Sequence, residues 1–367
     1  MQVLIFVKYH LVLNIITLIT AVSFIYYPII KIFSAYYSSI FTTDMKTKLT
    51  ELLSIDFPMI MAPMFLVSNF EMLKAGMNNG IAAAFPSLNF RKEGELENML
   101  DALNTEKAKL NVHGTYGINL IVQRTNPLYE KHLKICVDKK VPFYITSLGS
   151  PKQVIEQAHS YGAKVFCDVT NIVHAQKCFD LGCDGFIAVG QGAGGHAGPN
   201  TLQVLIPSLH EHFPNMPVIA AGGIANGAGI LSMLALGAAG VSVGTRFIAS
   251  TEAPVSDDYK NAIVTSGMND IVLTEKISGT PCTIINTPFA KKIGYKQNWF
   301  EKLLSNNART KKLFKMWVQV SGMKKLEEAV KPGNYHSLWC AGQSVELIHD
   351  ILPCADIIKR MKQEAGE

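Results

Sequence analysis

The chain has 367 residues, is 48% hydrophobic and carries a formal net charge of +5. This length and composition allow a large buried core. Lys and Arg residues gather between positions 291 and 325, but no nucleic-acid reader motif accompanies them, so we expect no nucleic-acid partner. The seven cysteines are odd in number and lack Cys-x-x-Cys spacing, which favours free thiols in a reducing cytosol over a disulfide framework or a zinc site.

An apolar run over residues 11–30, flanked by Lys8 and Lys31, has the length of a membrane-spanning helix. It lacks the small-residue cleavage site of a secretory signal. Residues 1–44 are therefore a hydrophobic leader that anchors the protein in a membrane, or translation begins at Met45, where an ordinary soluble amino terminus starts. We favour the second interpretation, and with it a cytoplasmic location. No candidate site residue precedes Met45, so a chain starting there is expected to be soluble and to bind its cofactor.

From Pro58 onward, short strand-like runs alternate with amphipathic helical patterns such as Ser68–Asn79 and Leu96–Ala108. Most of the strand-like runs are almost wholly apolar, as strands buried on both faces are. Eight of them predict a (β/α)8 TIM barrel over residues 45–255, with a doubly wound open sheet as the alternative. The predicted strands are Met59–Ala62, Ile81–Ala84, Tyr116–Leu120, Phe143–Thr146, Lys164–Val169, Phe186–Val189, Val218–Ala221 and Val241–Val243.

The pattern changes after the eighth predicted strand. Residues 256–335 read as helical and are richer in Lys and Asn, and they are too long for one last barrel helix. We interpret them as a small helical subdomain, a substrate lid beside the barrel. Residues 336–367 are then expected to return toward the barrel.

Glycines follow three of the predicted strands. After the sixth comes Gly190-Gln191-Gly192-Ala193-Gly194-Gly195-His196, after the seventh Gly222-Gly223, and after the eighth Gly244-Thr245-Arg246. Glycine at a strand end lets backbone N–H groups approach a ligand closely, and barrels hold phosphate after their seventh and eighth strands. The first motif also matches the dinucleotide fingerprint, but that fingerprint follows the first strand of its fold, so the context excludes it.

Ligands of a barrel lie at the carboxyl ends of its strands. Those ends offer apolar and amide groups and one imidazole, with no acid cluster for a metal and no lysine for a Schiff base. This chemistry suits a flavin, whose phosphate would be held by backbone N–H groups. Asp168 either orients a neighbouring group or is an exposed or capping residue. The candidate cofactor-binding residues are Ala62, Pro63, Met64, Asn119, Gln191, Gly194, Gly195, Gly222, Gly223, Gly244 and Thr245.

His196 is the candidate catalytic residue. A core histidine is usually structural, but this one is embedded in Gly-Gly-His-Ala-Gly, where few side chains would pack around it. An imidazole that titrates near neutral pH suits proton transfer. We therefore expect His196 to face the substrate.

Five motifs together carry a family resemblance. The chain resembles the nitronate monooxygenases, formerly called 2-nitropropane dioxygenases, from about residue 52 to about residue 347. The resemblance implies an FMN-bearing barrel that oxidises alkyl nitronates or nitroalkanes with O2 to carbonyl compounds and nitrite. It also implies that His196 acts as base or positions the substrate, and that Asn119, Gln191, Gly222, Gly223, Gly244 and Thr245 hold FMN. The matching motifs are Pro58–Met64, Gly117–Leu120, Gly194–Gly198, Ala220–Ile224 and Gly244–Arg246.

One position departs from the family pattern. The best-defined class of the family has a glutamate four residues before its histidine, where this chain has Gly192. The departure concerns substrate specificity more than the cofactor. Two alternatives are kept: an FMN-dependent NAD(P)H enoyl-ACP reductase, since such enzymes have a similar Gly-Gly-His loop, and a non-catalytic FMN-binding or membrane-anchored scaffold.

Overall fold

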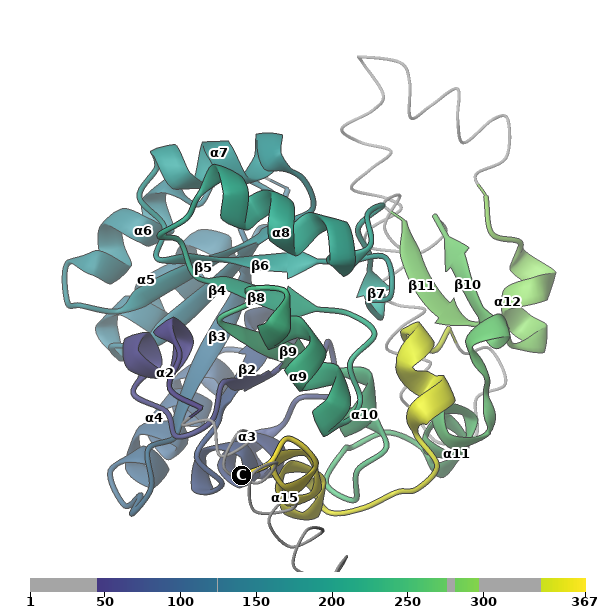
Figure 1. Ribbon diagram of the computed structural model, residues 1–367. Coiled ribbons are helices and arrows are strands. Elements are labelled where there is room, and N and C mark those ends of the chain that lie inside the picture. The colour runs from purple at the N-terminus through teal and green to yellow at the C-terminus, as the bar shows by residue number, and fades with distance from the viewer. Residues whose placement is uncertain (1–44, 124, 276–280, 297–337) are drawn as a thin grey trace, which may run out of the picture. The chain divides into compact units, whose positions relative to one another are not determined.

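Eight parallel strands close into a barrel in the computed structural model, which describes residues 45–123, 125–275, 281–296 and 338–367 (Figure 1). The first strand, β1, pairs with both β2 and β9, so the sheet has no edge and the open-sheet alternative is wrong. Each barrel strand overlaps one of the eight predicted runs. The barrel strands are β1 (Met59–Met61), β2 (Ala82–Pro86), β3 (Thr115–Ile121), β4 (Phe143–Ser147), β5 (Lys164–Val169), β6 (Gly185–Val189), β8 (Val218–Ala221) and β9 (Gly240–Val243).

Alternate residues of the strands fill the inside of the barrel, because successive side chains of a strand point to opposite faces. An apolar cluster that includes Ile60, Phe143, Ile145, Phe166 and Ile187 forms this interior. The Phe143 ring occupies the place where a β-carbon on Gly117 would lie, 2.4 Å from the ring. The interior is thus a packed apolar column, and only its ends are available to a ligand.

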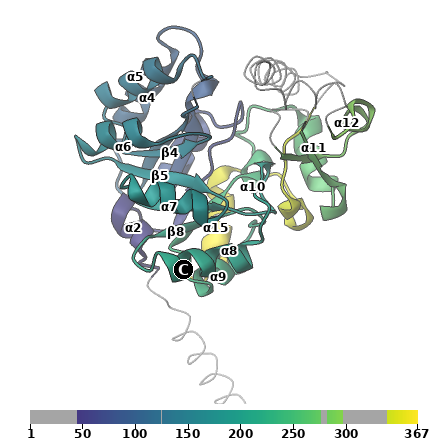
Figure 2. The same cartoon turned by 90° about the horizontal axis from the view of Figure 1, so that it is seen from above.

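Helices cover the outside of the barrel, as Figure 2 shows from above. Three of them begin at an asparagine N-cap, Asn69, Asn171 and Asn226, whose side chain accepts a hydrogen bond of 2.9 Å from an N–H of the first turn. These caps fix where the chain turns from a strand into a helix. The barrel helices are α3 (Phe70–Asn78), α4 (Glu95–Lys107), α5 (Tyr129–Asp138), α6 (Lys152–His159), α7 (Ile172–Asp180), α8 (Leu202–His212) and α9 (Gly227–Ala235), preceded by α2 (Lys48–Leu53).

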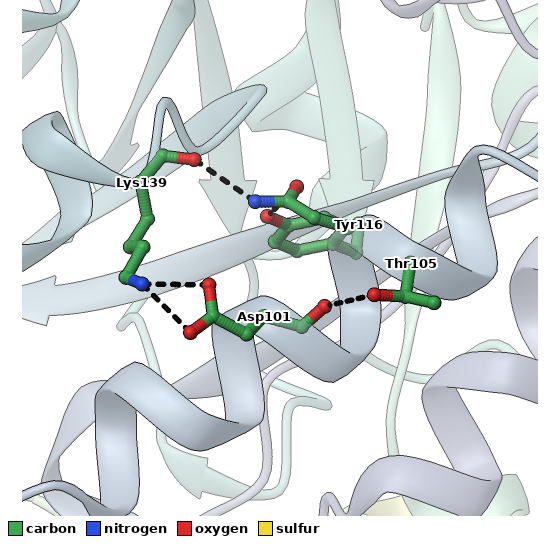
Figure 3. A network of polar contacts seen from close by, with 5 residues as sticks. Asp101, Thr105, Tyr116 and Lys139 are labelled. Carbon is green, nitrogen blue, oxygen red and sulfur yellow. Dashed lines mark hydrogen bonds and ion pairs between the residues drawn. The ribbon is translucent and has the colours of Figure 1, made fainter.

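A polar network ties α4, β3 and α5 together on the outer face of the barrel (Figure 3). The Tyr116 hydroxyl donates to the side-chain oxygen of Asn104 over 2.6 Å, and the Asn104 amide donates to the Lys139 carbonyl over 3.0 Å. The Lys139 ammonium lies 2.6 Å from a carboxylate oxygen of Asp101. Burial raises the pKa of Tyr116 well above its usual value, so this hydroxyl remains a donor. The network holds β3 from outside while its inner residues face the barrel axis.

The eighth helix of the barrel comes from the end of the chain. Helix α15 (Cys354–Glu364) contacts α3 and α9, the helices that follow β1 and β8 (Figure 1). This is the position of the helix that would follow β9, the eighth barrel strand. It buries Ile357, Ile358 and Met361 there. Residues between β9 and α15 are therefore an insert within the barrel, and Met45–Ala365 form one compact unit.

The insert is not wholly helical, which corrects the expectation for residues 256–335. Helices α11 (Asp257–Thr265) and α12 (Pro288–Ile293) are present, but β10 (Ile271–Thr274) and β11 (Cys282–Ile285) pair antiparallel between them. Both strands are rich in β-branched residues, which favour extended backbone. Strand β11 also pairs with β7 (Gly195–His196), giving a three-stranded sheet in the order β10-β11-β7. Residues 297–337 of the expected subdomain lie outside the described residues.

In the described parts of the chain, no helix combines the length and apolar character needed to cross a bilayer. The apolar run over residues 11–30 lies outside the described residues.

Candidate active site

The predicted site residues lie at the carboxyl ends of the barrel strands, which we call the mouth. Because all eight barrel strands are parallel, these ends meet at one side of the barrel. Residues 62–64 follow β1, Asn119 lies within β3, and residues 190–195 follow β6. Gly222 and Gly223 follow β8, and Gly244 follows β9 and caps the short helix α10 (Thr245–Ile248).

The glycine pair after β8 has the backbone that an anion site needs. Gly222 has a φ of 120° and Gly223 a φ of 76°, values that side chains other than glycine rarely allow. A β-carbon on Gly223 would meet nothing within 4 Å, whereas one on Gly222 would lie 2.6 Å from the Ala193 nitrogen. No hydrogen bond among the described residues uses the N–H groups of Gly222, Gly223 or Thr245. These donors are thus available to a phosphate at the mouth.

Arg246 does not serve this glycine pair. It is 4% exposed, and its guanidinium donates to the Asp350 carbonyl over 2.9 Å and to the Asp350 carboxylate over 2.6 Å. Arg360 donates to the other carboxylate oxygen of Asp350 over 2.7 Å. The two guanidinium groups hold the pKa of Asp350 below its usual range, although burial acts the other way. Arg246 therefore fastens α10 to the segment before α15, and backbone N–H groups supply the positive potential at the mouth.

His196 lies on a strand, which the sequence motif did not predict. In β7, His196 pairs with Cys282 and Gly195 pairs with Thr283, both in β11 of the insert. The His196 side chain is exposed, yet desolvation by the surrounding protein lowers its pKa from the usual 6.5. Both observations hold because water reaches part of the residue's surface while protein surrounds the ring. The imidazole is therefore neutral at neutral pH, the form that accepts a proton.

The loop before His196 is clamped by the insert and by the segment that follows it. The Thr283 hydroxyl donates to the Ala193 carbonyl, and the Gly342 N–H donates to the Thr245 hydroxyl over 3.0 Å. A β-carbon on Gly194 would lie 2.8 Å from the Gly342 nitrogen. The two backbones therefore touch, and glycine is required where they cross. Residues 341–342 are among the described residues that return to the barrel mouth.

An aromatic pair supports this clamp from behind. The Tyr259 ring of α11 stacks on Trp339 with centroids 5.4 Å apart, and its hydroxyl donates to the Cys340 carbonyl over 2.5 Å. The Trp339 carbonyl in turn accepts from the Ile285 N–H of β11 over 2.8 Å. Helix α11, strand β11 and residues 339–342 thus form one connected support for the histidine loop.

The departure from the family pattern at Gly192 has a steric counterpart. A β-carbon on Gly192 would lie 3.2 Å from both the nitrogen and the Cα of Gly223, so the two glycine loops pack backbone to backbone. A larger side chain at position 192 requires one of the loops to shift.

Polar residues cap the apolar column inside the barrel. Asn119, Ser147 and Asp168 share the inward parity of Gly117, Phe143 and Phe166 on β3, β4 and β5. The Asn119 amide donates to Ser147 Oγ over 2.8 Å, and Ser147 Oγ donates to Asp168 Oδ2 over 2.5 Å. Burial raises the pKa of Asp168 to about 6, against the opposing effect of the Ser147 hydrogen bond. Asp168 therefore does not cap a helix, because its carboxylate ends a polar chain at the mouth.

The residues after β1 form an apolar wall held by backbone contacts. Ala62 donates its N–H to the Val243 carbonyl over 2.8 Å, and Met64 donates its N–H to Ser68 Oγ over 2.9 Å. Met64 is 9% exposed, whereas Ala62 and Pro63 are half-buried. Gln191 is exposed and donates its backbone N–H to the Asn200 carbonyl over 2.8 Å.

Sequence reasoning missed Thr283 and Tyr259 as parts of this site. Both lie far along the chain in the insert, and no local motif marks them. Ser147 directly follows the fourth predicted strand, so the sequence placed it at the mouth, but it gave Ser147 no role. In the described ranges, no group of His, Cys, Asp and Glu side chains is arranged to hold a metal ion.

A family model described as nitronate monooxygenase matches residues 82–364 of the chain. A probable nitronate monooxygenase of Staphylococcus saprophyticus is 30% identical over 253 residues, which cover 65% of this chain and 67% of that protein. FabK from Thermotoga maritima has a similar structure, with a TM-score of 0.73 and 30% identity over 87% of this chain and 96% of that chain.

Another relative is named for a different activity. A Rhodococcus jostii protein named (3aS,4S,5R,7aS)-5-hydroxy-7a-methyl-1-oxo-octahydro-1H-indene-4-carboxyl-CoA dehydrogenase is 26% identical over 349 residues. The match covers 88% of this chain and 96% of that protein. The insert and the returning segment are thus part of a likeness that extends over most of both chains.

Proposed function

The chain belongs to the nitronate monooxygenase family of flavin-type oxidoreductases, and we propose that it binds FMN and oxidises alkyl nitronates or nitroalkanes with O2 to carbonyl compounds and nitrite. The observation that carries this proposal is the placement of His196. His196 lies on β7, the loop before it is clamped against Gly342, and the pKa of its imidazole is lowered. In the described part of the chain, the N–H groups of Gly222 and Gly223 make no hydrogen bond.

The mouth suits FMN. The N–H groups of Gly222, Gly223 and Thr245 make no hydrogen bond to any described residue, so they can hold the phosphate, and among the described residues nothing lies within 4 Å of a β-carbon on Gly223. Ala62, Pro63 and Met64 would line one side of the ring system, while Asn119 offers an amide. FMN is favoured over FAD because the sequence contains no second nucleotide motif. When bound, the flavin supplies an acceptor for the electrons that leave the substrate.

The role of His196 depends on whether the substrate is a neutral nitroalkane or a nitronate anion. A neutral nitroalkane has an acidic proton on the carbon beside its nitro group, and the neutral imidazole removes it. A preformed nitronate has no such proton, and His196 then orients the anion. The β7–β11 pairing and the contact of Gly194 with Gly342 hold the imidazole in place for either task.

Two measurements test this proposal. The flavin released from the purified protein should have the mass of FMN, and FAD would contradict the assignment. Nitrite should form when propyl nitronate and O2 are supplied. A protein that binds FMN but forms no nitrite from either nitronate or nitroalkane would exclude this substrate class.

A second candidate function rests on the carboxyl-CoA dehydrogenase relative, whose match covers 88% of this chain. This second function is the oxidation or reduction of an acyl thioester, a class of reaction that also includes enoyl-ACP reduction. The discriminating experiment adds NADH to the flavin-loaded protein without oxygen. Rapid bleaching of the flavin favours the thioester reductase, whereas bleaching by nitronate alone favours the monooxygenase.

A further inference from the structure

We propose that Ser147 and Asp168 are positioning residues that lock Asn119 so that it offers only a hydrogen-bond acceptor at the mouth, which selects a ligand with a ring N–H. This inference rests on the proposed function, since that ligand is the flavin. It concerns three inward-facing residues near the carboxyl ends of the neighbouring strands β3, β4 and β5.

The first step is the orientation of the Asn119 amide. One amide atom of Asn119 lies 3.2 Å from the Ile145 carbonyl oxygen and 2.8 Å from Ser147 Oγ. A carbonyl oxygen can only accept, so the atom facing Ile145 must be the nitrogen. Asn119 and Ile145 are also partners in the β3–β4 register, so the ladder itself holds this contact.

The second step is the direction of the Ser147 hydroxyl. Its hydrogen is donated to Asp168 Oδ2 over 2.5 Å, and a carboxylate can only accept. Ser147 Oγ is thereby left as an acceptor toward Asn119. Both hydrogens of the Asn119 amide are then donated, one to Ile145 and one to Ser147. Asn119 is 7% exposed, so it has little freedom to adopt another arrangement.

The third step is what remains for a ligand. Within the described ranges, Oδ1 of Asn119 has no hydrogen-bond partner, and this oxygen can only accept. The oxidised isoalloxazine ring has its single N–H at N3, between two carbonyl groups, and its two carbonyl oxygens, N1 and N5 are acceptors. An Asn119 held in this way therefore favours the flavin edge that includes N3–H and disfavours an edge made only of acceptors.

The test compares FMN with N3-methyl-FMN, which lacks this donor, by fluorescence titration of the flavin-free protein. The wild-type protein should bind FMN at least about tenfold more tightly than the methylated analogue, since an unpaired buried acceptor costs roughly 1–3 kcal/mol. In S147A, one Asn119 hydrogen loses its partner, and the preference should fall to about threefold or less. D168N should lie between the two, because its amide oxygen still accepts from Ser147.

Two control variants separate this role from general damage to the barrel. Ser87 follows β2 directly, and its buried hydroxyl has no partner among the described residues, so S87A should keep the full preference. The Asp184 carboxylate accepts a hydrogen bond from the Val165 N–H near the opposite end of β5, so D184N should also keep the full preference for FMN.

Each outcome decides a different claim. An unchanged preference in S147A, with FMN still bound, would overturn the inference alone, as would equal loss of preference in S87A. Equal binding of the two flavins by the wild-type protein would also overturn it. If the wild-type protein binds neither flavin, the proposed function fails as well.

Discussion

The contact between Gly342 and the histidine loop predicts that one added methyl group at position 342 will impair the site. Gly342 has a φ of −95° and a ψ of 171°, which alanine adopts without strain. Its β-carbon, however, would lie 2.4 Å from the Gly192 carbonyl oxygen and 2.9 Å from the Gly194 nitrogen. Carbon and carbonyl oxygen normally approach to about 3.3 Å. G342A must therefore displace either the histidine loop or the segment that contains residue 342 by roughly 0.9 Å.

The size of the effect follows from that displacement. A misplacement of about 1 Å costs on the order of 10²-fold in rate, so G342A should lower kcat for nitrite formation by that order. Overpacking costs about 1–3 kcal/mol, so the Tm should fall by several degrees. The assays are steady-state nitrite formation and thermal unfolding by circular dichroism.

Gly267→Ala is the matched control for this prediction. Gly267 lies in the same insert with a φ of −97°, and its β-carbon would lie 3.0 Å from a carboxylate oxygen of Glu346 and 3.9 Å from one of Asp270, both at the ends of side chains. G267A should therefore keep wild-type activity and Tm within error. If G342A also keeps both, residues 341–342 do not hold the histidine loop, and the clamp described above is wrong.

Four further predictions concern three residues of the mouth. H196N should keep its flavin, lose about 10²–10⁴-fold in rate on a neutral nitroalkane and lose less on the nitronate. Equal losses on both would show that His196 orients the substrate and does not remove its proton. Because the pKa of His196 is lowered, the wild-type rate on nitroalkane should fall only as the pH drops below its usual value of about 6.5. G223V should abolish flavin retention, because the phosphate is expected to occupy the open space beside Gly223 and because the φ of 76° disfavours a branched residue. A normal flavin content in G223V would place the phosphate elsewhere. Burial raises the pKa of Asp168 from 3.8 to about 6. Ionisation of Asp168 therefore destabilises the fold as the pH rises through that range. Flavin-free D168N should be more stable than the wild-type protein at pH 8, by on the order of 2 kcal/mol, and equally stable near pH 4. Parallel unfolding curves for the two proteins at every pH would contradict this.

The sequence alone was sufficient for the barrel and for most of the residues at its mouth. All eight predicted strands were confirmed, because a strand buried on both faces is a short apolar run that neighbouring glycines delimit. Parallel strands then place their carboxyl ends together, so residues such as Asn119, Gly222 and Gly244 were expected at one end of the barrel before any coordinates were known.

Only the tertiary structure showed what holds the histidine. The sequence motif predicted that His196 would have few neighbours, but its backbone pairs with β11, about 86 residues further along the chain. The same holds for α15, which completes the barrel after a long insert, and for Arg246, which pairs with Asp350 rather than facing the phosphate site. Local patterns encode strands, caps and glycine loops, because those depend on residues close in sequence. Contacts between distant segments depend on which surfaces remain after the barrel has closed, and the short strands of the insert carry no local signal of their partner.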